Sequence, residues 1–283
     1  MADVLSGVLR AFSFVLLLQG AGITLFIAIF RQRLVNCEGR LRRIGIASAL
    51  LGIAAVTGQF LLEAARMGGD LAAIVDPSLQ ATALQSSTGA AFALRLAGLS
   101  MVAAGLRGRT GLSATASIIG AVLAVVAFTV TGHTSTHPER WLLELLLLAH
   151  VLIVTFWVGA LPALYVATRC EPAAAAAQLV EAFSTIAVWL VPCIFLAGAG
   201  MAVILIPGWS VIREPYGELL LVKIVGFCLL MALAALNRWR LGPAIARIER
   251  GMVSFRRSVS AEYMLIATVL AATAIMTLFF SPE

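Results

Sequence analysis

The segment LLELLLLAHVLIVTFWVGALPALYVAT, residues 142–168, decides the fold class of this chain. Its only formally charged side chain is Glu144, close to the beginning of the run. A helix of about 20 apolar residues is long enough to cross the roughly 30 Å hydrocarbon core of a bilayer. The segment exceeds that length, so we predict that it spans a membrane as one helix.

Seven other runs have the same character. Hydrophobic residues make up 61% of the 283-residue chain, charged residues only 12%, and the mean hydropathy is +1.01, whereas soluble domains carry about 25% charged residues. These values exclude a soluble globule and predict an all-α polytopic membrane bundle of about eight transmembrane helices, a single transmembrane domain over residues 1–283. The predicted spans are 8–30, 41–63, 86–106, 112–132, 142–168, 183–206, 217–239 and 261–280.

The arginines are distributed unevenly among the predicted connections. Fourteen of them flank the connections that follow spans 1, 3, 5 and 7, against three at the other connections. Because cytoplasmic loops carry the excess of basic residues, this asymmetry predicts that both termini lie on the outer, periplasmic side. Neither a basic face interleaved with aromatic residues nor a GxxxxGK[ST] phosphate loop is present in the sequence, so we expect no nucleic-acid or nucleotide partner.

The three histidines of the chain fall within 18 residues. His133 and His137 belong to a polar connection, TGHTSTHPERW, and His150 lies about 12 Å inside the fifth predicted span. An imidazole at that depth needs a partner and commonly marks an ion or substrate path. Imidazole suits copper, zinc, iron and nickel. Alternatively, His150 makes a structural hydrogen bond between helices and the two loop histidines are merely exposed.

Other polar or sulfur-bearing side chains could complete a path. Met67, Met201 and Met276 fall at the same predicted end of the bundle as the histidines, and thioethers select Cu(I), although methionine is also a common packing residue. Arg95, deep in the third predicted span, requires a carboxylate or carbonyl partner. The candidate carboxylates are Glu63, Glu144 and Glu218.

Several motifs resemble those of one membrane family. They are EAFSTIAVWLVP (181–192), PYGELLLVKIVGFCLLMALAALNRWRLGP (215–243) and FRRSVSAEYMLIATVLAATAIMT (255–277), joined by TGH (131–133) and by WVGAL (157–161) after His150. Together they resemble the copper resistance protein D (CopD) family, most strongly over residues 181–280. The resemblance implies an inner-membrane, multi-pass protein that handles copper, generally an importer working with a periplasmic copper-binding partner of the CopC type. It places His133 and His150 where copper is expected to bind, and His137 is added by proximity.

The hypothesis is therefore copper-ion transport from periplasm to cytoplasm, without enzymatic activity. Copper ions, Cu⁺ or Cu²⁺, would be captured by His133 and His137, passed to His150 with help from Met67 and Met201, and released inward toward cysteines. The alternative is an assembly factor that binds copper and delivers it to a periplasmic cuproprotein without translocation. A haem-binding redox enzyme is a third possibility, but a two-haem site needs more axial ligands than the one intramembrane histidine supplies.

Overall fold

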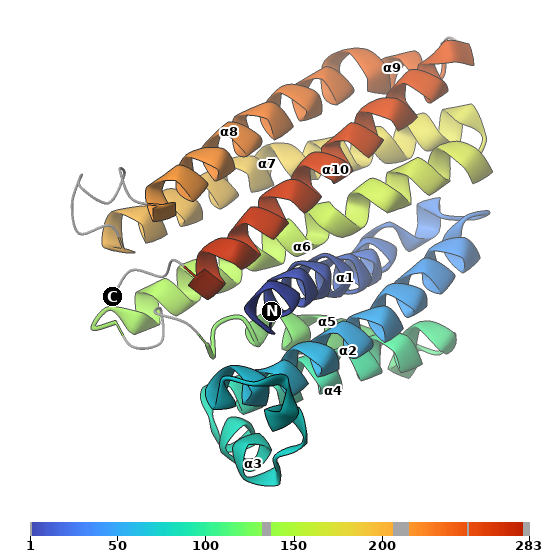
Figure 1. Ribbon diagram of the computed structural model, residues 1–283. Coiled ribbons are helices and arrows are strands. Elements are labelled where there is room, and N and C mark those ends of the chain that lie inside the picture. Colours follow the sequence, from blue (N-terminus) through green and yellow to red (C-terminus); the bar gives the residue numbers. More distant parts are fainter. Residues whose placement is uncertain (1, 132–136, 206–214, 248, 280–283) are drawn as a thin grey trace.

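The computed structural model describes residues 2–131, 137–205, 215–247 and 249–279, and these residues form helices without any strand (Figure 1). Short 3₁₀ segments, η1 (Arg31–Arg33) and η2 (Leu71–Val75), and a π-helical turn, η5 (Asn237–Leu241), connect them. The α-helices are α1 (Ala2–Phe30), α2 (Glu38–Gly68), α3 (Pro77–Gln85), α4 (Ser87–Arg107), α5 (Gly111–Val126), α6 (Arg140–Cys170), α7 (Ala173–Leu205), α8 (Pro215–Leu236), α9 (Gly242–Ala244) and α10 (Glu249–Phe279).

The all-helical membrane fold predicted from the sequence is confirmed, with one difference in length. Seven helices of the described chain are long and apolar enough to cross a membrane: α1, α2, α4, α6, α7, α8 with its π-helical extension, and α10. The predicted span 112–132 corresponds to α5, which has only 16 helical residues. At 1.5 Å per residue, α5 is about 24 Å long, which is less than the hydrocarbon thickness.

The connections between helices gather at two opposite ends of the bundle (Figure 1). We call one end the arginine-rich end, because it holds η1, the α4–α5 and α6–α7 connections and η5. The other end, the α3 end, holds α3 and the beginning of α6. The arginines that the sequence predicts on one side of the membrane flank the connections of the arginine-rich end.

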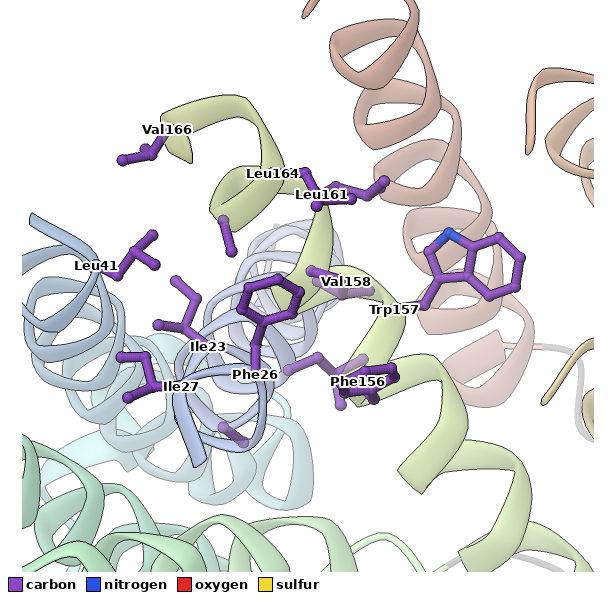
Figure 2. Packing of buried hydrophobic residues seen from close by; sticks show 14 of the residues in the cluster. Ile23, Phe26, Ile27, Leu41, Phe156, Trp157, Val158, Leu161, Leu164 and Val166 are labelled. Carbon is purple, nitrogen blue, oxygen red and sulfur yellow. The ribbon is translucent and has the colours of Figure 1, made fainter. Parts of the chain in front are cut away.

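Helix α1 is the central element, since it packs against α2, α4, α5, α6 and α10. Its closest approach is to α6, where Gly22 and Gly159 meet: a Cβ atom built on Gly159 would lie 2.0 Å from the carbonyl carbon of Gly22. Figure 2 shows Phe26 and Phe156 filling the space between these two helices, whereas Trp157 points to the opposite side of α6, toward α10. The α1–α6 contact therefore fixes which face of α6 is available to α7, α8 and α10.

Helices α7 and α8 stand at the periphery of the bundle. Helix α7 packs mainly on α6, and α8 packs on α10. Large apolar side chains on both helices are exposed, among them Trp189 (76%), Leu196 (65%) and Val225 (56%). Such surfaces are unfavourable in water and are typical of helices that face lipid.

At the arginine-rich end, Glu171 ties the α6–α7 connection to the one that precedes α2. Its carboxylate accepts hydrogen bonds from the backbone N–H groups of Asn36 (2.7 Å) and Cys37 (3.0 Å) and from the Asn36 side chain (2.9 Å). Burial acts to raise the pKa of Glu171, but these hydrogen bonds to the charged form outweigh it and hold the pKa below its usual value. The fold at this end therefore depends on an ionised Glu171.

Candidate metal site and buried polar cavity

His150 lies on the face of α6 that contacts α7. Its Nδ1 is 3.2 Å from the backbone carbonyl oxygen of Ile194. Because a carbonyl oxygen only accepts hydrogen bonds, Nδ1 is the donor in this contact and Nε2 keeps its lone pair. This is the arrangement of metal-ligating histidines, whose second ring nitrogen is held by a carbonyl or a carboxylate. A Cβ atom built on Gly198 would lie 3.5 Å from His150 Cε1, so the imidazole rests against a glycine of α7.

The loop histidines do not join His150 in one site. His133 lies outside the described residues. His137 precedes α6, and its Nδ1 accepts the backbone N–H of Glu139 at 3.1 Å. Since α6 begins at Arg140, ten residues of helix, about 15 Å, separate its first turn from His150. A metal ion bound at His137 would therefore have to move along α6 to reach His150.

The methionines predicted to help fall in different places. Met201 is half-buried on α7, three residues beyond Gly198, and therefore on the face that turns toward His150. Met67 is 47% exposed at the end of α2, in the half of the bundle away from α7 (Figure 1). Met276 is buried in α10. Within the described ranges, no group of three or more His, Cys, Asp or Glu side chains is placed to hold a metal ion.

A basic side chain of α8 faces the same region. Lys223 is close enough to His150 for the two side chains to interact electrostatically. A charged ammonium group would oppose any second positive charge on the imidazole, whether a proton or a metal ion. Lys223 would therefore disfavour any cation at His150.

Arg95 does not have the carboxylate partner that we expected. Among the described residues, no ion pair joins it to Glu63, Glu144 or Glu218, and Glu63 pairs instead with Arg66 at 3.2 Å. The Arg95 guanidinium lies 5.0 Å from the centre of the Phe128 ring, and its Nε has no hydrogen-bond partner. A cation–π contact replaces the expected ion pair because the turn that follows α5 presents an aromatic ring there instead of an acid.

The sequence analysis missed a buried polar group on α10. Glu262 is 3% exposed and accepts a hydrogen bond from Asn237 Nδ2 at 2.8 Å. Both residues belong to motifs that carry the family resemblance, NRWRL (237–241) and RRSVSAE (256–262). Asn237 opens the π-helical turn η5, a backbone irregularity that is frequent at functional sites. The sequence did contain a signal for this group, because Glu262 lies inside the predicted span 261–280 and an acid inside a membrane span is functional by default.

A half-open cavity of about 290 Å³, lined mostly by apolar side chains of α6, α7, α8 and α10, lies beside Glu262. Trp157, Asn237 and Glu262 line it, and it extends to Arg238 and Trp239 at the arginine-rich end. The Oδ1 atom of Asn237 and the hydroxyl of Ser258 are buried without hydrogen-bond partners, and the indole N–H of Trp157 is close enough to interact with the Glu262 carboxyl group without making a hydrogen bond of ordinary geometry. Residues from three motifs that are far apart in the sequence thus line one cavity, and Asn237 Oδ1 in its wall has no hydrogen-bond partner.

A second polar connection links α10 to the centre of the bundle. The hydroxyl of Tyr263 donates to Gln19 Oε1 on α1, and Gln19 Nε2 donates to Ser48 Oγ on α2 at 2.6 Å. These two hydrogen bonds connect α10, α1 and α2, and they begin at Tyr263, the residue that follows Glu262. They hold α10 at a fixed rotation, so that Glu262 faces the cavity and Tyr263 faces α1.

The fold and these buried polar groups define a polytopic helical membrane protein with ionisable side chains inside its spans. Two family models match the chain: copper resistance protein D over residues 177–276, and the copper resistance protein D-like N-terminal domain over residues 1–141. The chain belongs to the copper resistance protein D family. No curated protein and no solved structure matches it.

Proposed function

We propose that this protein binds copper ions and transports them across the bacterial inner membrane, from the periplasm to the cytoplasm. Membership of the copper resistance protein D family supports a role in copper handling. In this proposal the α3 end faces the periplasm, together with both termini, and the whole chain acts as a single transmembrane domain. The excess of arginine at the opposite end supports this orientation.

The observation that carries the proposal is the hydrogen bond between His150 Nδ1 and the carbonyl oxygen of Ile194. It orients the imidazole and leaves Nε2 free to bind a metal ion. Met201, on the adjacent face of α7, would supply a thioether, a ligand that favours Cu(I). His133 and His137 would receive copper at the α3 end, and Met67 would assist there. A periplasmic copper-binding protein of the CopC type is the proposed donor.

The test is metal analysis of the full chain, purified in detergent, loaded with copper and washed. We expect stoichiometric copper in the wild type, loss of the bound ion in His150→Ala, and weaker binding in Met201→Leu. Met264→Leu is the matched control, because Met264 is a 69% exposed residue of α10 away from the site. Equal copper content in the wild type and His150→Ala would overturn the assignment of His150.

The alternative function, delivery of copper to a periplasmic cuproprotein without translocation, uses the same ligands. The positions of the thiols favour delivery. Cys193 on α7 and Cys228 on α8 are exposed on the outside of the bundle, so they do not form a chain of sulfur ligands that leads from His150 to the arginine-rich end. Copper accumulation in sealed vesicles separates the two functions. Uptake that His150→Ala abolishes supports transport, and binding without accumulation supports delivery.

A further inference from the structure

We propose that Glu262 is a proton-binding site, which exchanges its proton with the arginine-rich side of the membrane through the cavity between α6, α7, α8 and α10. The proton site follows from the geometry around Glu262, and its coupling to copper movement rests on the proposed function.

The first argument is the burial of Glu262 without a counter-ion. The carboxyl group is 3% exposed, and Asn237 Nδ2 makes its hydrogen bond to Oε2. In the described part of the chain, no ion pair includes Glu262. An ionised carboxylate inside a membrane protein is costly unless it is paired, so a proton on Oε1 is the simplest way to neutralise it.

The nearby basic side chains donate hydrogen bonds to groups other than Glu262. Arg238 of η5 donates to the carbonyl oxygen of Ser184 at 2.7 Å, and Arg256 of α10 donates to that of Thr168 at 3.1 Å. The other ionisable residues on the elements around Glu262 are Asp3 and Arg10 on α1, Arg140, Glu144, His150, Tyr165, Arg169 and Cys170 on α6, Glu181 and Cys193 on α7, Tyr216, Glu218, Lys223 and Cys228 on α8, Arg240 on η5, and Arg250, Arg257 and Tyr263 on α10. Of these, Tyr263 bonds Gln19 and Arg169 bonds Tyr165.

The third argument is the unused hydrogen-bonding capacity around the carboxyl group. Trp157 Nε1 and Asn237 Oδ1 belong to residues that line the cavity, and Ser258 is one helical turn before Glu262 on the same face of α10. Asn237 Oδ1 and Ser258 Oγ are buried without a partner, and the Trp157 indole N–H is close enough to interact with the Glu262 carboxyl group, although it makes no hydrogen bond of ordinary geometry. A cavity of about 290 Å³ has room for several water molecules, each of which needs two to four polar partners. Asn237 Oδ1, Ser258 Oγ and the Glu262 carboxyl group are suitable partners for such water.

The fourth argument is the direction in which the cavity leads. It extends from Glu262 to Trp239, whose side chain is 73% exposed at the arginine-rich end. Water in this half-open cavity would connect Glu262 to the surface at that end. On the α3 side, His150 lies seven residues, about 10 Å, before Trp157 on the same face of α6. A copper path from the α3 end, through His150, and a proton path from the arginine-rich end, through the cavity, would therefore approach each other along α6.

The proton step is simple. A hydronium ion in the cavity transfers its proton to the carboxylate of Glu262, which gives a neutral carboxylic acid and one water molecule, and the reverse step releases the proton. Exchange through this cavity alone carries no net proton across the membrane. In a proton-coupled copper transporter, the proton released toward the arginine-rich side would have to reach Glu262 from the α3 side. Among the described residues, no group of three or more His, Cys, Asp or Glu side chains that could hold a metal ion includes Glu262, and Met231 is the one sulfur-bearing residue that lines the cavity, so the site fits a proton better than a copper ion.

The first experiment is infrared difference spectroscopy of the full chain in lipid nanodiscs, free of copper, across the pH range in which it stays folded. We expect a protonated-carboxyl band that grows as the pH falls, is lost in Glu262→Gln and shifts in Asn237→Ala, because the hydrogen bond to Oε2 is removed. Glu144→Gln, which alters the acid near the beginning of α6, is the control that should keep the band. A band that persists unchanged in Glu262→Gln would overturn the proposal.

The second experiment tests access and does not require Glu262 to be changed. Ala235 lines the cavity, whereas Leu196 of α7 is 65% exposed on the outer surface. Hydrogen–deuterium exchange of the carboxyl band should slow several-fold in Ala235→Trp and remain unchanged in Leu196→Trp. Equal exchange rates in both variants would show that the cavity is not the route. A titrating band in a protein that does not accumulate copper would refute transport and leave the proton site intact.

Discussion

Gly22 of α1 and Gly159 of α6 touch backbone to backbone. A Cβ atom on Gly159 would lie 2.0 Å from the carbonyl carbon of Gly22, and one on Gly22 would lie 1.9 Å from the carbonyl oxygen of Thr155. Small residues allow this approach between membrane helices. Because α6 carries both His150 and Trp157, this contact sets the position of the candidate metal site and of the cavity.

The first prediction concerns this helix crossing. Gly159→Ala should force α1 and α6 apart, since backbone atoms cannot move aside as a flexible side chain can. We expect a loss of stability at or beyond the upper end of the roughly 1–3 kcal/mol typical of overpacked cores. Thermal unfolding in detergent measures the effect. Gly39→Ala is the control, because a Cβ atom on Gly39 meets nothing within 4 Å, and unfolding temperatures that are equal in the two variants would refute this reading of the crossing.

The second prediction concerns the charge beside the histidine. Removing the ammonium group in Lys223→Met should tighten copper binding to the full chain several-fold, because the electrostatic repulsion at His150 disappears. Lys223→Arg keeps the charge and should bind copper as the wild type does. Competition titration with a chelator measures both affinities. Unchanged affinity in Lys223→Met would mean that Lys223 does not influence the site.

The third prediction concerns the connection at the arginine-rich end. Glu171→Ala leaves the backbone N–H groups of Asn36 and Cys37 without their acceptor, which costs roughly 1–3 kcal/mol for the buried N–H of Cys37 and less for Asn36, which is exposed to water. We expect a clear fall in unfolding temperature. Glu181→Ala, which changes an exposed acid on α7, should have little effect, so a fall of equal size in both variants would contradict the role of Glu171.

The fourth prediction is the pH dependence of that contribution. The pKa of Glu171 is lower in the folded protein than its usual value near 4.5. Its stabilising effect is therefore fully present above that usual value and is lost as the pH falls through the lower, folded-state pKa. Unfolding temperatures measured on the acid side should decline less steeply in Glu171→Gln than in the wild type. Identical slopes would rule out Glu171 as the titrating group.

The fifth prediction concerns two thiols at the arginine-rich end. Burial and the neighbouring Glu171 raise the pKa of Cys37 to about 12, so the thiol stays protonated at neutral pH and very little of the reactive thiolate is present. Cys170 is half-buried, and its Sγ accepts a hydrogen bond from Arg40 at 3.3 Å. Iodoacetamide should therefore label a variant that keeps only Cys170 much faster than one that keeps only Cys37. Equal rates would contradict the buried, protonated state of Cys37, which also makes this thiol a poor inward copper ligand.

The sequence by itself determined the membrane class, the positions of the long helices and the gathering of arginine at one end. These properties depend on local hydropathy and length, because each span must satisfy its own backbone hydrogen bonds within the membrane. The sequence also placed His150 inside a span. It did not reveal that α5 is shorter than a full span, since the apolar run 112–132 extends beyond the last helical residue, Val126.

Only the tertiary structure decided which polar groups meet. Asn237 and Glu262 are 25 residues apart in sequence, and Trp157 is more than 100 residues from Glu262, yet all three line one cavity. Arg95 lies over Phe128 and not beside an acid. Such pairings depend on the rotation and crossing of whole helices, which contacts such as Gly22–Gly159 fix. Because hydropathy does not specify those rotations, the motif residues could be identified from the sequence, but their proximity in the fold could not be predicted from it.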